Sequence, residues 1–209
     1  MNPFIVLSNK LSCKLDERRD KKICGMSLGA FVPTPYAESH GATGSQSAPY
    51  PGLDIIFRDL VLAKEDSFID IGCGKGRVIA YMASRGFPCK ITGIEINPVV
   101  AGIAKRWTSR YPNIEIIEGD AFGLDYNDYT VLFMYRPMEE FTFKMFVEYL
   151  EETLTHPVKL YYYVDVQSGY YLNDRPGWTL LNRRELFFVR GLFIHKEPQR
   201  YSVWSYTPG

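Results

Sequence analysis

The stretch from Ser67 to Arg77, which reads SFIDIGCGKGR, constrains the fold of this chain more than any other. It begins with the apolar residues of a buried strand (Phe68, Ile69, Ile71), continues with three alternating glycines and passes into an amphipathic segment. Because glycine lacks a Cβ atom, such a turn can adopt positive φ angles and let the backbone approach a ligand closely. The amide groups at the start of the following helix then face that ligand. This order of elements predicts a nucleotide-like ligand at the carboxyl edge of a parallel sheet.

The spacing of the glycines narrows the kind of ligand. The pattern Asp-x-Gly-x-Gly-x-Gly, from Asp70 to Gly76, differs from the Gly-x-Gly-x-x-Gly pattern of dinucleotide-binding folds and lacks the Gly-Lys-Ser/Thr of a P-loop. An acidic side chain two positions before the first glycine would repel a pyrophosphate, whereas it suits a ligand that carries an ammonium group. The alternative for the glycines alone is a plain strand-to-helix turn in another α/β protein.

Two acidic residues after later strands narrow the ligand further. Residues 90–96 predict the second strand, and Glu95 near its end follows the glycine turn by about 20 residues, where a carboxylate can accept hydrogen bonds from both hydroxyls of a ribose. Residues 114–119 predict the third strand, which Asp120 and Ala121 follow. Each acid taken alone is a weak signal, and Asp120 could instead cap a surface turn. Combined with the glycine turn, Glu95 makes a nucleoside ligand the stronger interpretation.

With these three motifs the chain resembles class I S-adenosylmethionine-dependent methyltransferases, and the resemblance extends over about residues 50–206. It implies S-adenosylmethionine as the cofactor, with the glycine turn at its methionine end, Glu95 at the ribose and Asp120 with Ala121 at the adenine. Cys73, inside the turn, is interpreted as a small side chain and not as a nucleophile. The candidate cofactor-binding residues are Asp70, Gly72, Cys73, Gly74, Gly76, Glu95, Ile96, Asp120 and Ala121.

Within this family the chain looks most like a poorly characterised bacterial group whose first motif, Asp-x-Gly-x-Gly-Lys-Gly-Arg, is repeated here. The fourth strand of that group typically ends in Tyr-Asn-Pro-Phe, whereas residues 135–138 read Tyr-Arg-Pro-Met. An arginine cannot accept a hydrogen bond from an amine nucleophile, as the asparagine would, but it can bind a carboxylate or a phosphate. We take Tyr135 and Arg136 as the candidate catalytic residues. The alternative is that Arg136 pairs with Glu139 or Glu140.

A general base is needed only if the nucleophile is an alcohol or a protonated amine. By their positions at strand ends or in a covering loop, Tyr135, Asp165 and His40 are candidates for that role. His156 and His195 are interpreted as structural or surface residues. No cluster of His, Asp and Glu at ligand spacing occurs, so we expect no metal site.

The alternation of strand-like and helix-like segments predicts an α/β fold, namely a Rossmann-like three-layer α/β/α sandwich. We expect a mostly parallel seven-stranded sheet with an antiparallel C-terminal strand pair, to which residues 187–194 could add a hairpin. The expected helices cover residues 51–64, 76–84, 97–110 and 139–155, and the expected strands after the first cover residues 90–96, 114–119, 129–136, 159–165, 178–184 and 200–206.

Residues 1–50 do not have the pattern of regular α/β structure. Residues 16–22 form a mixed charge run that predicts a solvated helix or turn, and residues 25–51 are rich in glycine, serine and proline. Aromatic side chains at Phe31 and Tyr36 favour a loop that packs over a site as a lid. We therefore divide the chain into an N-terminal extension, residues 1–50, and a methyltransferase domain, residues 51–209; a partly disordered tail is the alternative for residues 1–30.

The composition limits the location and the partners. The formal net charge is zero, which argues weakly against a nucleic-acid partner, and no apolar run approaches the length that spans a bilayer. Residues 1–7 lack the basic start and the long apolar region of a secretory signal. Four cysteines without Cys-x-x-Cys spacing indicate free thiols in a reducing cytoplasm. We expect a cytoplasmic enzyme with a small-molecule methyl acceptor and no membrane partner; the alternatives are a protein or RNA methyltransferase and a non-catalytic binding module.

Overall fold

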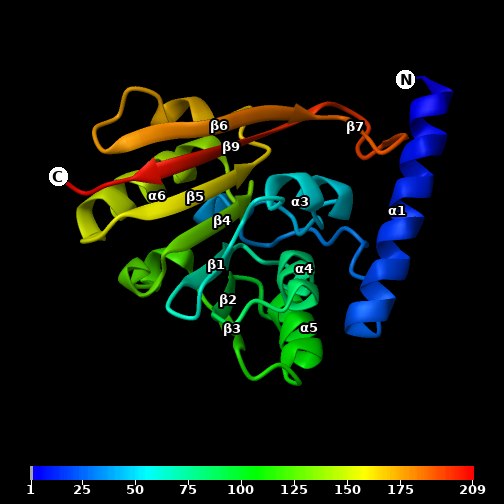
Figure 1. Cartoon of the computed structure of the whole chain (residues 1–209), viewed down its shortest axis with the longest axis horizontal. Helices are drawn as coiled ribbons and strands as arrows, with labels where there is room; N and C mark the ends of the chain where they lie inside the picture. The colour runs from blue at the N-terminus through cyan, green and yellow to red at the C-terminus, as the bar shows by residue number, and fades with distance from the viewer. Residues whose placement is uncertain (1) are drawn as a thin grey trace.

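The computed structural model describes residues 2–209 and contains the seven-stranded sheet expected from the sequence (Figure 1). The strand order is β3-β2-β1-β4-β5-β9-β6. The first five strands along the chain run parallel, and β9 is antiparallel to both of its neighbours, β5 and β6. The predicted α/β fold with an antiparallel C-terminal pair is confirmed. The strands are β1 Ser67–Ile71, β2 Lys90–Glu95, β3 Ile114–Glu118, β4 Val131–Tyr135, β5 Val158–Tyr163, β6 Trp178–Leu186 and β9 Gln199–Tyr206.

Helices cover both faces of the sheet, which explains why the central strands β1 and β4 are buried along almost their whole length. Side chains alternate between the two faces: Phe68 of β1 packs in one core cluster, whereas Ile69 and Ile71 pack in the other. The first cluster includes residues of α3 Tyr50–Ile56, α4 Arg77–Arg85 and α5 Pro98–Thr108, and the second includes residues of α6 Glu140–Thr153. The short 3-10 helices are η1 Ala121–Gly123, η2 Tyr126–Asp128 and η3 Gly169–Leu172.

The predicted helix over residues 51–64 is wrong in its second half, because α3 ends at Ile56. Beyond it, Leu60 and Leu62 are buried while Val61 between them is 84% exposed. This alternation is incompatible with one face of a helix, and residues 60–63 form no regular structure.

The expectation of no regular structure in the N-terminal extension is also wrong for α1 Pro3–Cys24, which stands beside α4 at the edge of the molecule (Figure 1). Asn2 accepts a hydrogen bond from the Phe4 amide at its start, and Gly25 ends it with φ 77°. The buried face of α1 is polar, so no apolar period marks the side that packs on the protein. Its buried residues are Ser8, Asn9, Ser12, Asp16, Asp20 and Cys24.

A hairpin packs on α1, and the later part of the extension crosses the sheet edge. A separate hairpin of β7 Phe188–Val189 and β8 Leu192–Phe193 packs on α1, where the Phe193 amide donates to Ser8 Oγ at 2.9 Å. Residues 31–48 cross the carboxyl edge of the sheet and include the short helix α2 Ala37–His40. We call these residues the crossing segment. Among residues 2–209, no helix is both long enough and apolar enough to cross a membrane.

Candidate functional site

The glycine turn after β1 has the backbone conformation that its glycines make possible. Gly72, Gly74 and Gly76 have φ angles of 70°, 57° and 89°. A Cβ atom at Gly72 would lie 2.3 Å from Pro137 Cβ, and one at Gly74 would lie 2.6 Å from Ser45 Oγ. Side chains cannot fit at these two positions because the end of β4 and the crossing segment lie directly against the turn.

Asp70 lies under this turn as a buried carboxylate with a missing partner. Its side chain is 2% exposed, and its Oδ2 has no hydrogen-bond partner among the described residues. Burial raises the pKa of Asp70 well above its usual value, and the nearby Glu95 carboxylate raises it further. A buried acid of this kind fits a cationic group, which would replace the water that the carboxylate has lost. We define the Asp70 pocket as the hollow of about 270 Å³ that Asp70 lines with the glycine turn and residues 45–48.

The Glu95 side chain at the end of β2 is held in a fixed orientation. Its Oε2 accepts from the Gly74 amide and its Oε1 from the Asn97 amide, both at 2.9 Å. Burial raises the pKa of this carboxyl group, and the amide hydrogen bonds act in the opposite direction. Glu95, Ile96 and residues 42–46 line a hollow of about 370 Å³, the Glu95 pocket. Because each carboxylate oxygen has a second lone pair, Glu95 can still accept hydrogen bonds from a ligand.

Asp120 and Ala121 line a third hollow, the Asp120 pocket, of about 400 Å³. Asp120 Oδ1 accepts from the Phe122 amide at 3.1 Å and so caps η1, while Oδ2 lies 3.9 Å from His40 Nε2. The capping role and the ligand-facing position therefore belong to one side chain. The rest of the pocket is mostly apolar and suits a flat ring, with walls that include Ile71, Ile94, Ile96, Phe122, Pro137 and Met138.

Tyr135 ends β4 at the junction of these hollows. It lines the Asp70 and Glu95 pockets as well as a larger hollow described below. Its ring centroid lies 4.9 Å from that of Tyr163. Burial raises the pKa of Tyr135 to about 12, against the opposing effect of Arg77 and Arg136. The phenol is therefore protonated at neutral pH and can donate a hydrogen bond.

Arg136 has a strained backbone, with φ 38° in the left-handed region. Val164 after β5 has φ 61°, which is more unusual because its side chain is β-branched. Arg136 Nη1 donates to Gln167 Oε1 at 2.8 Å, and its nearest carboxylate oxygen, in Glu139, is 4.0 Å away. The pairing with Glu140 is wrong, because that side chain bonds Lys144 and Tyr170 instead.

Both strained residues line the largest hollow near the site, the Arg136 pocket, of about 1290 Å³. Its walls come from residues 31–46, from the ends of β4 and β5, and from residues 195–199 before β9. Sequence analysis missed its polar residues Gln46, Gln167 and His195, because only the folded sheet brings these segments together. His195 Nδ1 lies 3.3 Å from the Glu197 amide and 3.0 Å from Gln199 Nε2, which orients the ring.

The other two candidates for a general base, Asp165 and His40, do not line the Arg136 pocket. Asp165 is fully buried and pairs with Arg200 Nε at 2.5 Å and Arg183 Nε at 3.6 Å, so it stabilises the β5–β9 edge. His40 lines the Asp120 pocket and not the Arg136 pocket. A catalytic role for either residue stays a prediction.

Cys73 lies buried inside the glycine turn. Burial raises the pKa of the Cys73 thiol well above its usual value, with Asp70 and Glu95 adding to the effect. The thiol is therefore protonated and a poor nucleophile. Within the described part of the chain, no group of three or more His, Cys, Asp and Glu residues is placed to hold a metal ion.

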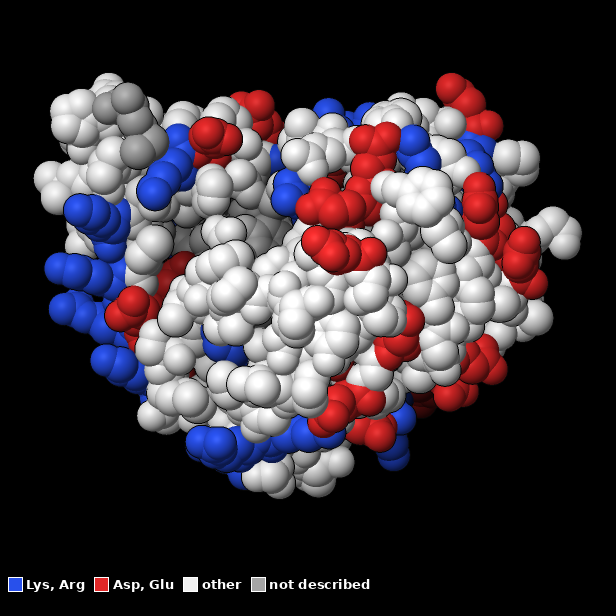
Figure 2. All heavy atoms as spheres, turned by 180° about the vertical axis from the view of Figure 1, so that it is seen from behind, with Lys and Arg blue, Asp and Glu red and all other residues white. Residues whose placement is uncertain are grey.

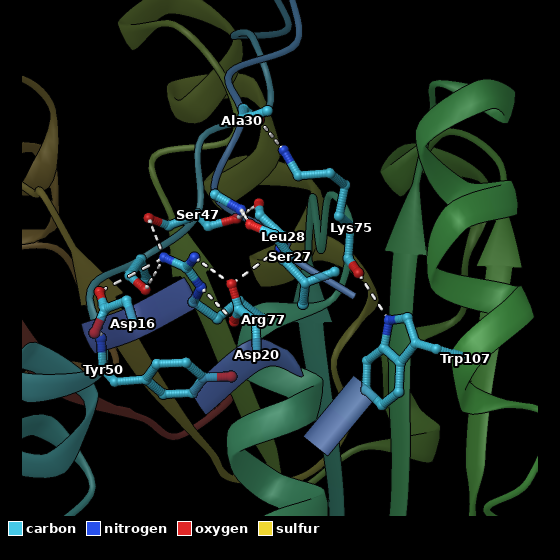
Figure 3. Close-up of polar contacts among 12 residues, drawn as sticks. Asp16, Asp20, Ser27, Leu28, Ala30, Ser47, Tyr50, Lys75, Arg77 and Trp107 are labelled. Carbon is cyan, nitrogen blue, oxygen red and sulfur yellow. Dashed lines mark hydrogen bonds and ion pairs between the residues drawn. The ribbon is translucent and has the colours of Figure 1, made fainter. Parts of the chain in front are cut away.

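The two basic residues of the glycine motif bind the N-terminal extension (Figure 3). Arg77 donates from Nε and Nη2 to the two carboxylate oxygens of Asp20 at 2.9 and 2.6 Å. Its Nη1 lies 3.4 Å from the Ala48 oxygen and 3.7 Å from Asp16 Oδ2. Lys75 Nζ donates to the Ala30 oxygen. We call Arg77, Asp16 and Asp20 the Arg77 cluster; it joins α1 and the crossing segment to the start of α4. No local sequence pattern indicates this cluster, because its members lie far apart in the chain.

Comparisons with known proteins agree with the fold. Residues 68–156 match a family model described as "Methyltransferase domain". A methyltransferase structure from Pyrococcus furiosus aligns with a TM-score of 0.60 at 16% identity, covering 96% of this chain and 98% of that one. An RNA methyltransferase from Salinibacter ruber, in complex with S-adenosyl-L-homocysteine, aligns with a TM-score of 0.55 at 21% identity, covering 78% and 94%.

One curated relative also matches in sequence. It is the probable ribosomal RNA small subunit methyltransferase A of Methanosarcina acetivorans, 28% identical over 96 residues. The match covers 44% of this chain and 35% of the relative, so it spans about a third of that protein's length.

Proposed function

We propose, from the class I S-adenosylmethionine-dependent methyltransferase domain that this chain carries, that it methylates a small-molecule acceptor bound in the Arg136 pocket. The observation that carries the proposal is the buried Asp70 oxygen without a partner, beside Glu95 and under the glycine turn. The pockets are contiguous: Gly72 lines the Asp120, Glu95 and Asp70 pockets, and Tyr135 lines the last two and the Arg136 pocket. The four pockets thus form a row that leads from the proposed donor site to the proposed acceptor site.

The residues along this row fit the parts of S-adenosylmethionine. Asp70 would compensate the charge of the methionine ammonium group, and Glu95 would accept hydrogen bonds from the ribose. Asp120 and Ala121 would hold the adenine against Ile96. When bound, the cofactor supplies a methyl group on a positively charged sulfur, which the acceptor displaces in line. Gly72, Cys73 and Gly74 would leave the space that the methionine end occupies, and Gly76 would contribute through the positive φ angle of the turn.

Tyr135 and Arg136 would position the acceptor. The protonated Tyr135 hydroxyl can donate a hydrogen bond to an acceptor oxygen or nitrogen, and it cannot act as a base at neutral pH. The Arg136 guanidinium can bind a carboxylate or phosphate of the acceptor, because Gln167 occupies only one of its nitrogens within hydrogen-bond distance. Holding two reactants in a near-attack geometry is the main contribution that such a site makes to rate.

Residues 41–48 would close the site against water, as the lid expected for the N-terminal extension. Thr43 donates from its amide to the Pro137 oxygen at 2.9 Å and from Oγ1 to the Arg136 oxygen at 2.7 Å. The Glu139 amide donates to the Gly41 oxygen at 2.8 Å. These bonds connect the crossing segment to the end of β4, beside both proposed substrates. Expulsion of water strengthens the electrostatic contacts inside a site.

A small molecule is favoured over RNA because the formal net charge is zero and the Arg136 pocket carries Glu139 and Glu197 beside its arginine. RNA binding usually requires a basic surface along the nucleic acid. We also infer membership of the bacterial group with the Asp-x-Gly-x-Gly-Lys-Gly-Arg motif, and a cytoplasmic location from the four free cysteines.

A thermal shift assay tests whether the protein binds S-adenosylmethionine, the first requirement of the proposal. At a cofactor concentration about 100 times Kd, S-adenosylmethionine or S-adenosylhomocysteine should stabilise the protein by about 2.7 kcal/mol, or about 5–10 °C for a chain of this size. ATP, which has the adenosine but not the ammonium group, is the control and should give a much smaller shift. If neither S-adenosyl compound raises Tm, the proposal fails.

Transfer from radiolabelled S-adenosylmethionine tests the acceptor. Small molecules that carry a carboxylate or phosphate should accept label, and Arg136→Gln should raise their KM more than it lowers kcat. A mixed RNA is the competing substrate, tested at two salt concentrations. Labelled RNA with a steep salt dependence would refute the small-molecule assignment while leaving the methyl donor in place.

A further inference from the structure

Helix α1 packs on the protein through a mostly polar side. The residues that it buries include Ser8, Ser12, Asp16 and Asp20, which follow one another at intervals of four. Beside this buried side the helix exposes Phe4, Leu7, Leu11 and Leu15, spaced by three and four residues, with exposures of 64%, 70%, 49% and 44%. Such spacing places these side chains on one stripe of the helix. The helix is about 33 Å long, so the stripe covers its first half.

The stripe continues onto the neighbouring hairpin. The Phe4 ring lies 6.1 Å from the Phe193 ring, which is 4.9 Å from the Phe188 ring. Phe188 is 57% exposed. Contiguous exposed apolar surface of this kind marks a binding surface more often than isolated exposed residues do.

Basic side chains accompany the apolar stripe. Figure 2 shows Lys and Arg side chains in a column along the left edge, where α1 lies in that view. Five basic residues of α1 are exposed, against one exposed acidic residue, Glu17; the basic residues are Lys10, Lys14, Arg18, Lys21 and Lys22. The two acids that would neutralise them, Asp16 and Asp20, are turned inward and used by Arg77. The outer face of α1 is therefore positively charged although the chain as a whole has no net charge.

We propose that the outer face of α1 binds an anionic lipid bilayer, with the apolar stripe in the headgroup boundary and the basic residues on the lipid phosphates. A helix with Phe and Leu on one side and many Lys and Arg lies in the plane of a membrane surface without crossing it. The expectation of no membrane partner came from the lack of a spanning segment, and this stripe becomes recognisable only once the other face of α1 is known to be buried.

The charge and the apolar side chains of the outer face favour an anionic bilayer over a second copy of the chain or RNA. A second copy of the chain would bring two positively charged faces together, which opposes pairing. RNA would satisfy the lysines and arginines but leave Leu7 and Leu11 in water, since phosphate contacts need no apolar side chains. An anionic bilayer satisfies both the charge and the apolar stripe.

Sedimentation with vesicles tests the proposal on the full chain. We expect binding to vesicles of equal parts phosphatidylglycerol and phosphatidylcholine, weak binding to phosphatidylcholine alone, and a decrease with added salt. Leu7→Gln with Leu11→Gln should weaken binding at least about tenfold, because burial of apolar side chains is lost. The matched control is Val61→Gln with Phe141→Gln, at residues 84% and 75% exposed on other elements, which should bind as the natural chain does.

The charge is tested separately. Lys10→Gln with Lys14→Gln should weaken binding roughly 25-fold at low salt, at about fivefold for each lysine near the surface. Lys64→Gln with Lys159→Gln, two exposed lysines on other elements, should have little effect. Glutamine is a good helix former, and circular dichroism should show unchanged helix content.

Three results would overturn the proposal. They are absence of binding to the anionic vesicles at low salt, binding that the leucine substitutions leave unchanged, and self-association through α1 that the same substitutions abolish while vesicle binding is absent. RNA binding that depends on the lysines alone, without vesicle binding, would likewise assign the face to another partner.

Discussion

Asp70→Asn should have opposite effects on the stability of the protein alone and on its affinity for S-adenosylmethionine. Asp70 is buried, its Oδ2 has no partner, and its pKa is raised by burial and by Glu95. An Asp with a raised pKa in the folded state is protonated at higher pH when folded than when unfolded. Its contribution to stability is therefore full below its ordinary pKa and is lost as pH rises through the folded value. Neutral pH lies above the ordinary pKa of an aspartate, so Asp70 there destabilises the protein without ligand, and asparagine removes that cost.

The magnitude follows from the burial. An unsatisfied buried polar group costs about 1–3 kcal/mol, so Asp70→Asn should raise the Tm of the protein without ligand by about 2–10 °C. With the cofactor, the variant loses a charge-assisted contact of about 1.5–3 kcal/mol, which weakens binding by about 10- to 150-fold. Differential scanning fluorimetry with and without S-adenosylmethionine measures both effects, and isothermal titration calorimetry gives Kd.

Asp165→Asn is the matched control, because Asp165 is equally buried but pairs with Arg200 and Arg183. Removing one partner of a buried ion pair is strongly destabilising, so this variant should lower Tm. The reasoning is refuted if Asp70→Asn lowers Tm as Asp165→Asn does and binds the cofactor with unchanged affinity. Asp70 would then be a structural residue.

Three further substitutions test the acceptor side and the extension. Arg136→Asn should leave Tm unchanged or higher, because asparagine tolerates φ 38° better, while the KM of an anionic acceptor rises at least about tenfold in a steady-state methylation assay. Tyr135→Phe should lower kcat/KM by about tenfold without changing the pH profile between about pH 6 and 9, since the phenol, with its pKa near 12, is protonated throughout; a lost basic limb in that range would contradict this. Asp16 has its pKa raised to about 7, chiefly by burial, so stability should fall as pH rises from about 4 to 7 and then level off; chemical denaturation should show that Asp16→Asn flattens this slope.

Sequence patterns predicted the segments whose buried residues are apolar and whose turns contain glycine. The glycine turn and the apolar runs of β1, β2 and β4 predicted the sheet, and Glu95 and Asp120 were placed at its carboxyl edge, as the structure has them. Apolar periodicity did not predict α1, because the face that α1 buries is polar and contacts Arg77.

Contacts between distant segments were the other source of failure. His195 was interpreted as structural or surface, yet the pairing of β9 with β5 carries the preceding loop to the wall of the Arg136 pocket. Periodicity within a segment holds no information about which other segment faces it. Arg136 was the exception, since its place after a buried strand was enough to put it at that edge.

The Arg77 cluster includes residues that lie outside the part of the chain that matches the methyltransferase family. The family match begins at residue 68, and a cut placed there would remove both acids that surround the Arg77 guanidinium. The shortened chain would keep the whole glycine motif and the five parallel strands, yet the Arg77 guanidinium, which is 6% exposed in the whole chain, would lose both of its counter-charges. A boundary drawn by resemblance therefore separates a buried cation from its counter-charges, which lie on the helix that packs against the motif.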